Sequence, residues 1–234
     1  MKVLVKGIEF DKISVEKAAG RVLELAKSNT GAYVVTPNTE ILARAADKDF
    51  SAVLSGADLV LCDGVGVSAM ALFKGRCLPR VTGMDLAEIL LKKAADHKIP
   101  VFLYGAKEGV AKRARKKLEE RYQGLVIEGV CNGYEREDVA TELIRQSKAR
   151  IVFVCTSSPK QEFFAKKAIE SGINAVFLAF GGALDVLSGD KRRAPRIFRI
   201  LGLEWAYRFA KEPFRVKRFV KTVASSHKKP KIYK

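Results

Sequence analysis

The chain has 234 residues, 48% of them hydrophobic, which is enough to bury one sizeable core and argues against disorder. Its four cysteines form no CxxC pair and only two histidines accompany them, which argues against a zinc site or a disulfide scaffold. The formal net charge of +17 is concentrated at one end, because residues 191–234 hold 15 Lys or Arg against two acids. A nearly neutral domain followed by a basic tail is therefore predicted.

Two further features of the sequence argue against export and against a membrane-spanning segment. The first residues lack the apolar run and cleavage site of a signal peptide, so export is not expected. The longest apolar passage, residues 173–187, contains a glycine pair and Asp185 and falls short of the ~20 residues that cross a bilayer. We therefore expect a cytoplasmic protein without a membrane span, in which Cys62 and Cys155 are small core residues.

In chain order, residues 2–10 favour a strand or hairpin, and apolar β-branched runs then alternate with stretches of helical character. The predicted strands are 32–36, 58–62, 101–104, 125–130, 151–156 and 175–180. The predicted helices are 15–28, 38–47, 86–97, 107–122, 137–148 and 159–171. Such alternation predicts an α/β fold, a Rossmann-like parallel sheet with helices on both faces.

The alternating pattern stops near Gly189, where a basic run and Pro195 mark a change of composition. We therefore predict a catalytic domain over residues 1–194 and a basic helical appendage over residues 195–234. Within the appendage, apolar and basic residues after Pro213 fall on opposite helical faces, which is typical of an interfacial amphipathic helix.

Ligands of open parallel sheets bind beyond the carboxyl ends of the strands, so those ends are the places to search. Residues 64–69 follow a predicted strand and fit the loose dinucleotide pattern GxGxxA, which would indicate an NAD-binding oxidoreductase. However, Asp85 stands at an apparent helix start capped by Thr82, not at the end of the next strand. A glycine-rich turn that lets a helix pack closely explains the pattern equally well.

Carboxylates near these ends have two interpretations. Asp63 lies where a general base would project toward a ligand, but it is also suited to cap a helix that starts near Gly64. Asp47-Lys48-Asp49 has the spelling of a metal-binding DxD, but it lies at a helix end, so no metal site is predicted. Residues 105–109 and 158–161 each open a helix after a strand, and either turn is suited to hold a diphosphate.

Taken together, the strand ends and the tail resemble the WecG/TagA/CpsF family of bacterial glycosyltransferases over nearly the whole chain. The matching segments, in order, are Thr36-Pro37-Asn38-Thr39-Glu40, Asp63-Gly64-Val65-Gly66, Arg80-Val81-Thr82-Gly83-Met84-Asp85-Leu86, Pro159-Lys160-Gln161-Glu162, Gly181-Gly182-Ala183-Leu184-Asp185, Arg193-Ala194-Pro195, Leu201-Gly202-Leu203-Glu204-Trp205 and Glu212-Pro213-Phe214-Arg215. Chance supplies one or two such pieces, not the ordered series.

The resemblance implies inverting transfer of N-acetylmannosamine from a UDP-sugar donor to the GlcNAc of a diphospho-undecaprenol lipid, with a β-1,4 linkage, in teichoic acid or related cell-wall synthesis. It makes Asp63 the catalytic base. Because the sequence offers no convincing metal site, we expect the reaction to need no metal cofactor, with arginines and backbone N–H groups neutralising the departing diphosphate. It further implies a set of substrate-binding residues, which are Thr36, Asn38, Arg80, Gln161, Gly181, Gly182, Asp185, Arg208, Arg215 and Arg218. Two departures from the family pattern, Cys62 and the turn at residues 155–158, leave the donor sugar less firmly implied.

The basic tail is expected to bind a polyanion, and an anionic membrane surface and nucleic acid are the two realistic partners. We favour the membrane, because the sheet lacks the aromatic platform or recognition helix of a nucleic-acid-binding protein. The sequence therefore predicts a peripheral enzyme on the inner face of the bacterial cell membrane, with a polyprenyl-diphosphate-linked GlcNAc acceptor and without nucleic acid.

Overall fold

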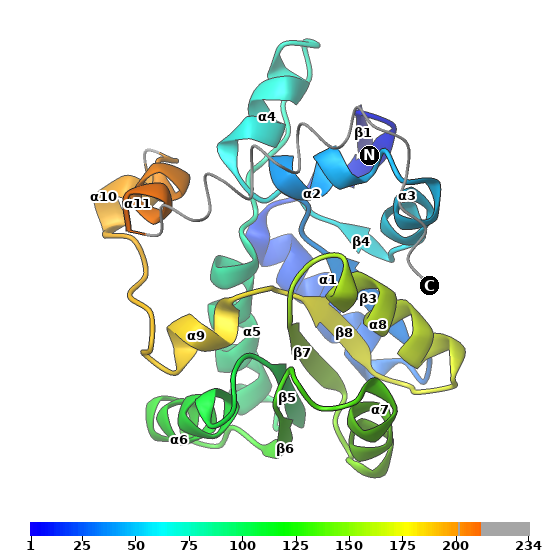
Figure 1. Ribbon diagram of the computed structural model, residues 1–234, viewed down its shortest axis with the longest axis vertical. Helices are drawn as coiled ribbons and strands as arrows, with labels where there is room; N and C mark the ends of the chain where they lie inside the picture. The colour runs from blue at the N-terminus through cyan, green and yellow to red at the C-terminus, as the bar shows by residue number, and fades with distance from the viewer. Residues whose placement is uncertain (201, 212–234) are drawn as a thin grey trace.

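A computed structural model of the chain, which describes residues 1–200 and 202–211, contains a six-stranded parallel sheet between two layers of helices (Figure 1). The strands lie in the order β4-β3-β8-β7-β5-β6. Their bounds are β3 Ala32–Val35, β4 Leu59–Val60, β5 Val101–Gly105, β6 Ile127–Cys131, β7 Ile151–Cys155 and β8 Val176–Ala179. The predicted fold class is confirmed.

The helices divide between the two faces of the sheet, as the two hydrophobic cores show. One core contains buried residues of α1 Val15–Lys27, α5 Gly83–Asp96, α6 Val110–Arg121 and α9 Ala183–Leu187. The other contains buried residues of α2 Thr39–Arg44, α3 Lys48–Ser55, α4 Val65–Leu72, α7 Glu137–Gln146 and α8 Lys160–Glu170. Successive strand residues point to opposite faces, so Val34 enters the first core and Val35 the second.

The second core is completed by an antiparallel hairpin, β1 Lys2–Val5 and β2 Ile8–Asp11, which confirms the expectation for residues 2–10. Alternate hairpin residues are buried, among them Val5 and Phe10. At its end, Asp11 Oδ2 accepts a hydrogen bond of 3.0 Å from Val60 N on the edge strand β4. The hairpin is thereby attached to the edge of the sheet.

The remaining described helices are α10 Arg196–Ile200 and α11 Glu204–Lys211, which follow a linker after α9. Figure 1 shows this pair, and also α4, extending outward from the body formed by the sheet and the other helices. Residues 212–234, for which the sequence predicts an amphipathic helix, lie outside the described residues. None of the helices in the described part of the chain is long and apolar enough to span a bilayer.

One predicted helix is wrong in its extent. The sequence favoured a single helix over residues 38–47, whereas the chain forms α2 and then a separate α3. Asp47 is the N-cap of α3, and its carboxylate accepts a hydrogen bond of 2.9 Å from Phe50 N. Asp47 therefore begins a helix instead of ending one, and its carboxylate oxygen accepts a hydrogen bond from the backbone of that helix.

Candidate active site

The connections leaving β3 and its neighbour β8 pass to opposite faces of the sheet, toward α2 on one side and α9 on the other. Such a switch point is where open α/β sheets bind ligands. Four turns that the sequence singled out meet around it: those after β3, β4, β7 and β8. The hydrogen bonds between these turns define the candidate site.

The turn after β3 contributes Thr36 and Asn38. Thr36 is buried, and its hydroxyl donates a hydrogen bond of 3.4 Å to the carbonyl oxygen of Ala179 at the end of β8. Asn38 is the N-cap of α2, and its Oδ1 accepts a hydrogen bond of 3.0 Å from Ile41 N. Both residues therefore have structural partners, and they hold the turn at the switch point.

The turn after β4 brings Asp63 beside the turn after β3. The backbone N–H of Asp63 donates a hydrogen bond of 3.2 Å to the carbonyl oxygen of Pro37. Gly64 follows with a φ of 95°, and a Cβ built on it would lie 3.9 Å from the Cβ of Asn38. The N-cap of α4 is Gly64 itself, so Asp63 is not the capping residue that the alternative interpretation required.

The glycine pattern at residues 64–69 has a packing explanation in the structure. A Cβ on Gly66 would lie 2.4 Å from Thr39 Oγ1, closer than any side chain tolerates, so glycine lets α4 approach α2. The pattern also follows β4, which is an edge strand of two residues. This close approach favours the packing interpretation of the GxGxxA pattern over a dinucleotide site.

Gln161 connects the turns after β7 and β8. Its side chain is only 3% exposed. Its Oε1 accepts a hydrogen bond of 2.8 Å from Gly181 N, and its Nε2 donates one of 2.9 Å to Glu162 Oε1. Gln161 thus fixes the start of the Gly181-Gly182 turn, a bridging role that was not predicted, while its contact with a ligand stays a prediction.

Glu162 supports Gln161 from inside the protein, a role that was not predicted for it. Its side chain is 1% exposed, and burial raises the pKa of its carboxyl group above the ordinary value of 4.5, against the hydrogen bond from Gln161 and the positive charge of Arg44. Arg44 also donates to the carbonyl oxygen of Ser158 and pairs with Glu40 at 2.9 Å. In sequence, Glu162 was indistinguishable from an ordinary acid in a first helical turn.

Arg80, one of the predicted substrate-binding residues, lies between the turn after β4 and the appendage. The next residue, Val81, donates a backbone hydrogen bond of 2.8 Å to the carbonyl oxygen of Cys62. Arg80 Nη2 donates one of 2.6 Å to the carbonyl oxygen of Arg199 on α10. The appendage therefore packs next to the strand end that carries Asp63.

The turn between α10 and α11 makes a second contact with this region. Gly202 has a φ of 72°, and a Cβ on it would lie 2.2 Å from Val65 Cγ1 and 3.8 Å from Arg80 Nη1. Val65 is the first residue of α4, two positions after Asp63. Glycine thus lets the backbone of the appendage pack against the start of α4.

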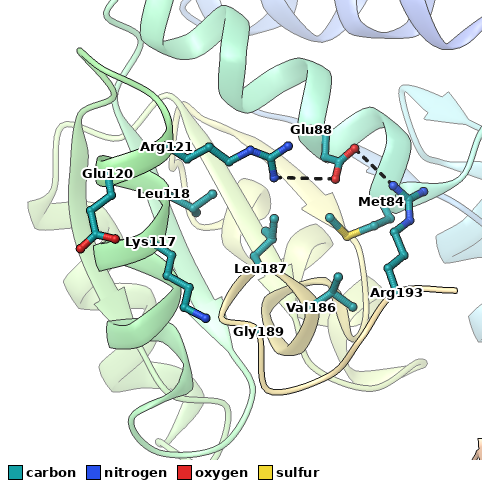
Figure 2. Close-up of a pocket in the computed structure, with 10 residues that line it drawn as sticks. All are labelled: Met84, Glu88, Lys117, Leu118, Glu120, Arg121, Val186, Leu187, Gly189 and Arg193. Carbon is teal, nitrogen blue, oxygen red and sulfur yellow. Dashed lines mark hydrogen bonds and ion pairs between the residues drawn. The ribbon is translucent and has the colours of Figure 1, made fainter. Parts of the chain in front are cut away.

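The linker before α10 is anchored by Arg193. The guanidinium of Arg193 bonds to the carboxylate of Asp85 and pairs with Glu88 at 3.3 Å, and Figure 2 shows Glu88 lying between Arg193 and Arg121. Burial alone would raise the pKa of Asp85, but hydrogen bonds from Thr82 and Arg193 lower it below 3.8. The N-cap role predicted for Thr82 is confirmed, since its Oγ1 accepts a hydrogen bond of 3.1 Å from Asp85 N.

Asp185 lies on α9, one turn beyond the glycine pair. Its carboxylate pairs with Lys191 at 3.3 Å, and its side chain is 23% exposed. A Cβ on Gly182 would lie 3.6 Å from Asp185 Oδ2. The carboxylate of Asp185, which the resemblance implied to bind substrate, is therefore next to the turn that Gln161 fixes.

The structure does not test three of the predicted site residues. Arg208 belongs to α11 but its side chain is not among the described ones, and Arg215 and Arg218 lie outside the described residues. Among residues 1–200 and 202–211, no cluster of three or more His, Cys, Asp or Glu side chains is suited to hold a metal ion.

Comparison with known proteins identifies the family of the chain. The model of the family described as "Glycosyl transferase WecG/TagA/CpsF family" matches residues 2–226. A protein of Bacillus spizizenii named N-acetylglucosaminyldiphosphoundecaprenol N-acetyl-beta-D-mannosaminyltransferase is 38% identical over 82% of this chain and 76% of its own length. A protein of the same name from Bacillus subtilis is 38% identical over 81% of this chain and 75% of its own length. The chain, with its strand-end turns meeting at the switch point, thus belongs to the WecG/TagA/CpsF family of glycosyltransferases.

Proposed function

We propose that this glycosyltransferase moves N-acetylmannosamine, or a related sugar, from a UDP donor to GlcNAc-diphospho-undecaprenol with inversion, forming a β-1,4 linkage. The observation that carries the proposal is the 38% identity to two Bacillus relatives whose names state a mannosaminyl transfer to that lipid-linked acceptor. The identity extends over three quarters of each relative, so it includes most of the fold that forms the site.

Asp63 is the proposed general base. Inversion requires a carboxylate that takes the proton of the acceptor hydroxyl while the diphosphate leaves from the opposite face of the sugar. Asp63 supports this role because it directly precedes the glycine turn beside Asn38 and does not occupy the N-cap of α4. Thr36, Asn38 and the Gly181-Gly182 turn then line the proposed binding region, with Asp185 as the nucleoside contact.

The departing diphosphate needs positive charge that is fixed in place. Arg80 is the candidate that we favour among the described residues, because it lies between the strand end of Asp63 and the carbonyl oxygen of Arg199. We assign Arg208, Arg215 and Arg218 to the same task, so that residues 195–234 complete the site of the domain formed by residues 1–194. The close approach of Gly202 to Val65, at the start of α4, supports a contribution of the appendage to the site.

The proposed acceptor is a membrane lipid, so the enzyme is proposed to act peripherally at the inner face of the cell membrane. The tail supplies the attraction, since residues 191–234 carry a net charge of +13 and anionic headgroups favour basic segments. Binding that prefers anionic vesicles over duplex or single-stranded DNA distinguishes this role from a nucleic-acid-binding tail. A preference for DNA would contradict it.

The direct test is a screen of UDP-sugars against a synthetic GlcNAc-diphospho-lipid with a short, soluble chain, followed by determination of the product linkage. UDP-N-acetylmannosamine is expected to give a β-1,4 disaccharide lipid. Efficient transfer of a different sugar would change the assigned donor and keep the reaction class. Turnover of a nicotinamide cofactor without any UDP-sugar would overturn the proposal.

A further inference from the structure

The free end of α4 carries two adjacent apolar side chains that are largely exposed in the part of the chain that the structure describes. Leu72 is 69% exposed and Phe73 is 92% exposed, the highest value among the large hydrophobic residues of the described chain. Figure 1 shows α4 projecting away from the sheet and its two helix layers. We refer to residues 72–76, at the end of this projection, as the α4 tip.

The α4 tip is basic as well as apolar. Lys74 and Arg76 are exposed, and Gly75 between them has a φ of 70°, which turns the chain back toward the body. No Asp or Glu occurs anywhere in residues 64–84. An aromatic and an aliphatic side chain flanked by cations, with no acid in the neighbouring sequence, match an interface of apolar chains and anionic headgroups.

The α4 tip is also rigidly related to the candidate site. α4 begins at Val65, two residues after Asp63, and its eight residues extend roughly 12 Å at the usual helical rise. Val67 and Ala71 on the inner side of α4 are buried in the second core, which fixes the direction of the helix. Contact of the tip with a surface would thus hold Asp63 about one helix length above it.

A second copy of the chain fits this feature less well than a membrane. A stable protein interface buries about 800 Å² on each partner, whereas a Leu and a Phe side chain together supply at most about half of that. Insertion of a few apolar side chains between lipids has no such requirement of area. The exposed cations beside Phe73 would repel the same tip of another copy and attract anionic lipid.

We propose that the α4 tip is a second membrane contact, in which Leu72 and Phe73 enter the interfacial region of an anionic bilayer while Lys74 and Arg76 bind lipid phosphates. This inference rests on the proposed function, because a lipid-linked acceptor is what brings the site to the membrane. It differs from anchoring by the tail, because it fixes the height and tilt of the site as well as its attachment.

The chain has a single tryptophan, Trp205, which permits a direct optical test. In full-length protein carrying Trp205→Phe, the variant Phe73→Trp should show a blue-shifted emission with vesicles of equal parts phosphatidylglycerol and phosphatidylcholine. Brominated lipid chains should quench that emission. The matched control is Leu143→Trp in the same background, because Leu143 is an exposed residue of α7 on the opposite side of the molecule, and its emission should not change.

A second measurement avoids dependence on the fluorescent variants. The double variant Leu72→Ser with Phe73→Ser should bind the same vesicles about tenfold more weakly, while its turnover of a soluble acceptor stays at the level of the unmodified chain. Unchanged emission of the Phe73→Trp variant on vesicles that do bind the protein would overturn the proposal and leave the tail as the anchor. A blue shift without vesicles that grows with protein concentration would overturn it in favour of a second copy. If the α4 tip enters the bilayer but the chain shows no transferase activity, the proposed function would be refuted and the membrane contact would stand.

Discussion

Asp63 is the residue on which the proposed chemistry depends. Asp63→Asn keeps the size of the side chain but removes the basic carboxylate, so turnover should fall by roughly two to four orders of magnitude with little change in UDP binding. Steady-state kinetics and calorimetric titration with UDP measure the two quantities. The matched control is Asp47→Asn, because asparagine also caps helices and Asp47 serves only α3. Near-normal turnover of Asp63→Asn would remove Asp63 from the base role.

Glu162 predicts a pH dependence of stability. Its pKa is raised in the folded protein by burial, so the folded chain holds this proton to a higher pH than the unfolded chain does. The free energy of unfolding should therefore decrease as the pH rises above 4.5, by up to about 1.4 kcal/mol per pH unit, until the folded carboxyl group has ionised.

Glu162→Gln removes this titration and retains an oxygen that can accept the hydrogen bond from Gln161. Denaturant unfolding of both proteins at a series of pH values from 4.5 upward should show a flatter profile for the variant. Glu108→Gln, at an exposed position, is the control and should follow the unmodified chain. Parallel profiles for the chain and Glu162→Gln would contradict the raised pKa.

At the residue level, the sequence located the turns but not the partners inside them. Thr36, Asn38, Asp63, Gln161 and the glycine pair were found because parallel strands end at one edge of the sheet. The link from Gln161 to Gly181 joins residues 20 positions apart, so it depends on packing that no local pattern encodes. The alternative in which Asp63 caps α4 was wrong by one residue. Gly64 is the N-cap, and it provides the backbone conformation that starts the helix.

Among the elements, the turn between α10 and α11 is the most sensitive contact of the appendage. Gly202→Ala adds a Cβ that collides with Val65, so it should displace the appendage and lower turnover of a soluble acceptor by roughly ten- to a hundredfold. Gly172→Ala is the control, because Gly172 has a similar φ of 86° but a Cβ there meets nothing within 4 Å.

Both glycine variants should lose about 1–2 kcal/mol of stability from the left-handed backbone, which denaturant unfolding measures. Only Gly202→Ala should lose activity beyond that common effect. Equal turnover of the two variants would mean that the contact with Val65 does not serve catalysis.

Element boundaries were predictable where hydrophobic periodicity was strong and unreliable where side chains cap the backbone. The strands at residues 101–105 and 151–155 agree closely with prediction because both are buried along their whole length. β4 is shorter than its apolar run, because only Leu59 and Val60 pair with β3. α3 was missed because its start depends on one carboxylate, that of Asp47, inside what looked like a continuous helix.

In the whole molecule, the tail is proposed to complete the active site as well as to attach the enzyme to the membrane. If it completes the site, Arg208→Ala and Arg215→Ala should each lower turnover of a soluble acceptor by about a hundredfold, the usual cost of removing a donor that stabilises developing charge. A chain truncated after Arg193 should lose that activity as well. Vesicle binding of each protein, measured beside turnover, separates attachment from catalysis, and full activity of both arginine variants would reduce the tail to an anchor.

The position of β8 has a consequence for synthesis of the chain on the ribosome. β8 is the last strand in sequence, yet it lies in the middle of the sheet, where it pairs with β3 on one side and β7 on the other. Until residues 176–179 have left the exit tunnel, the first two strands of the sheet and the next three remain separate fragments, each with an unpaired apolar edge. The nascent protein should therefore depend on chaperones for most of its translation and fold only after the final strand joins the two halves.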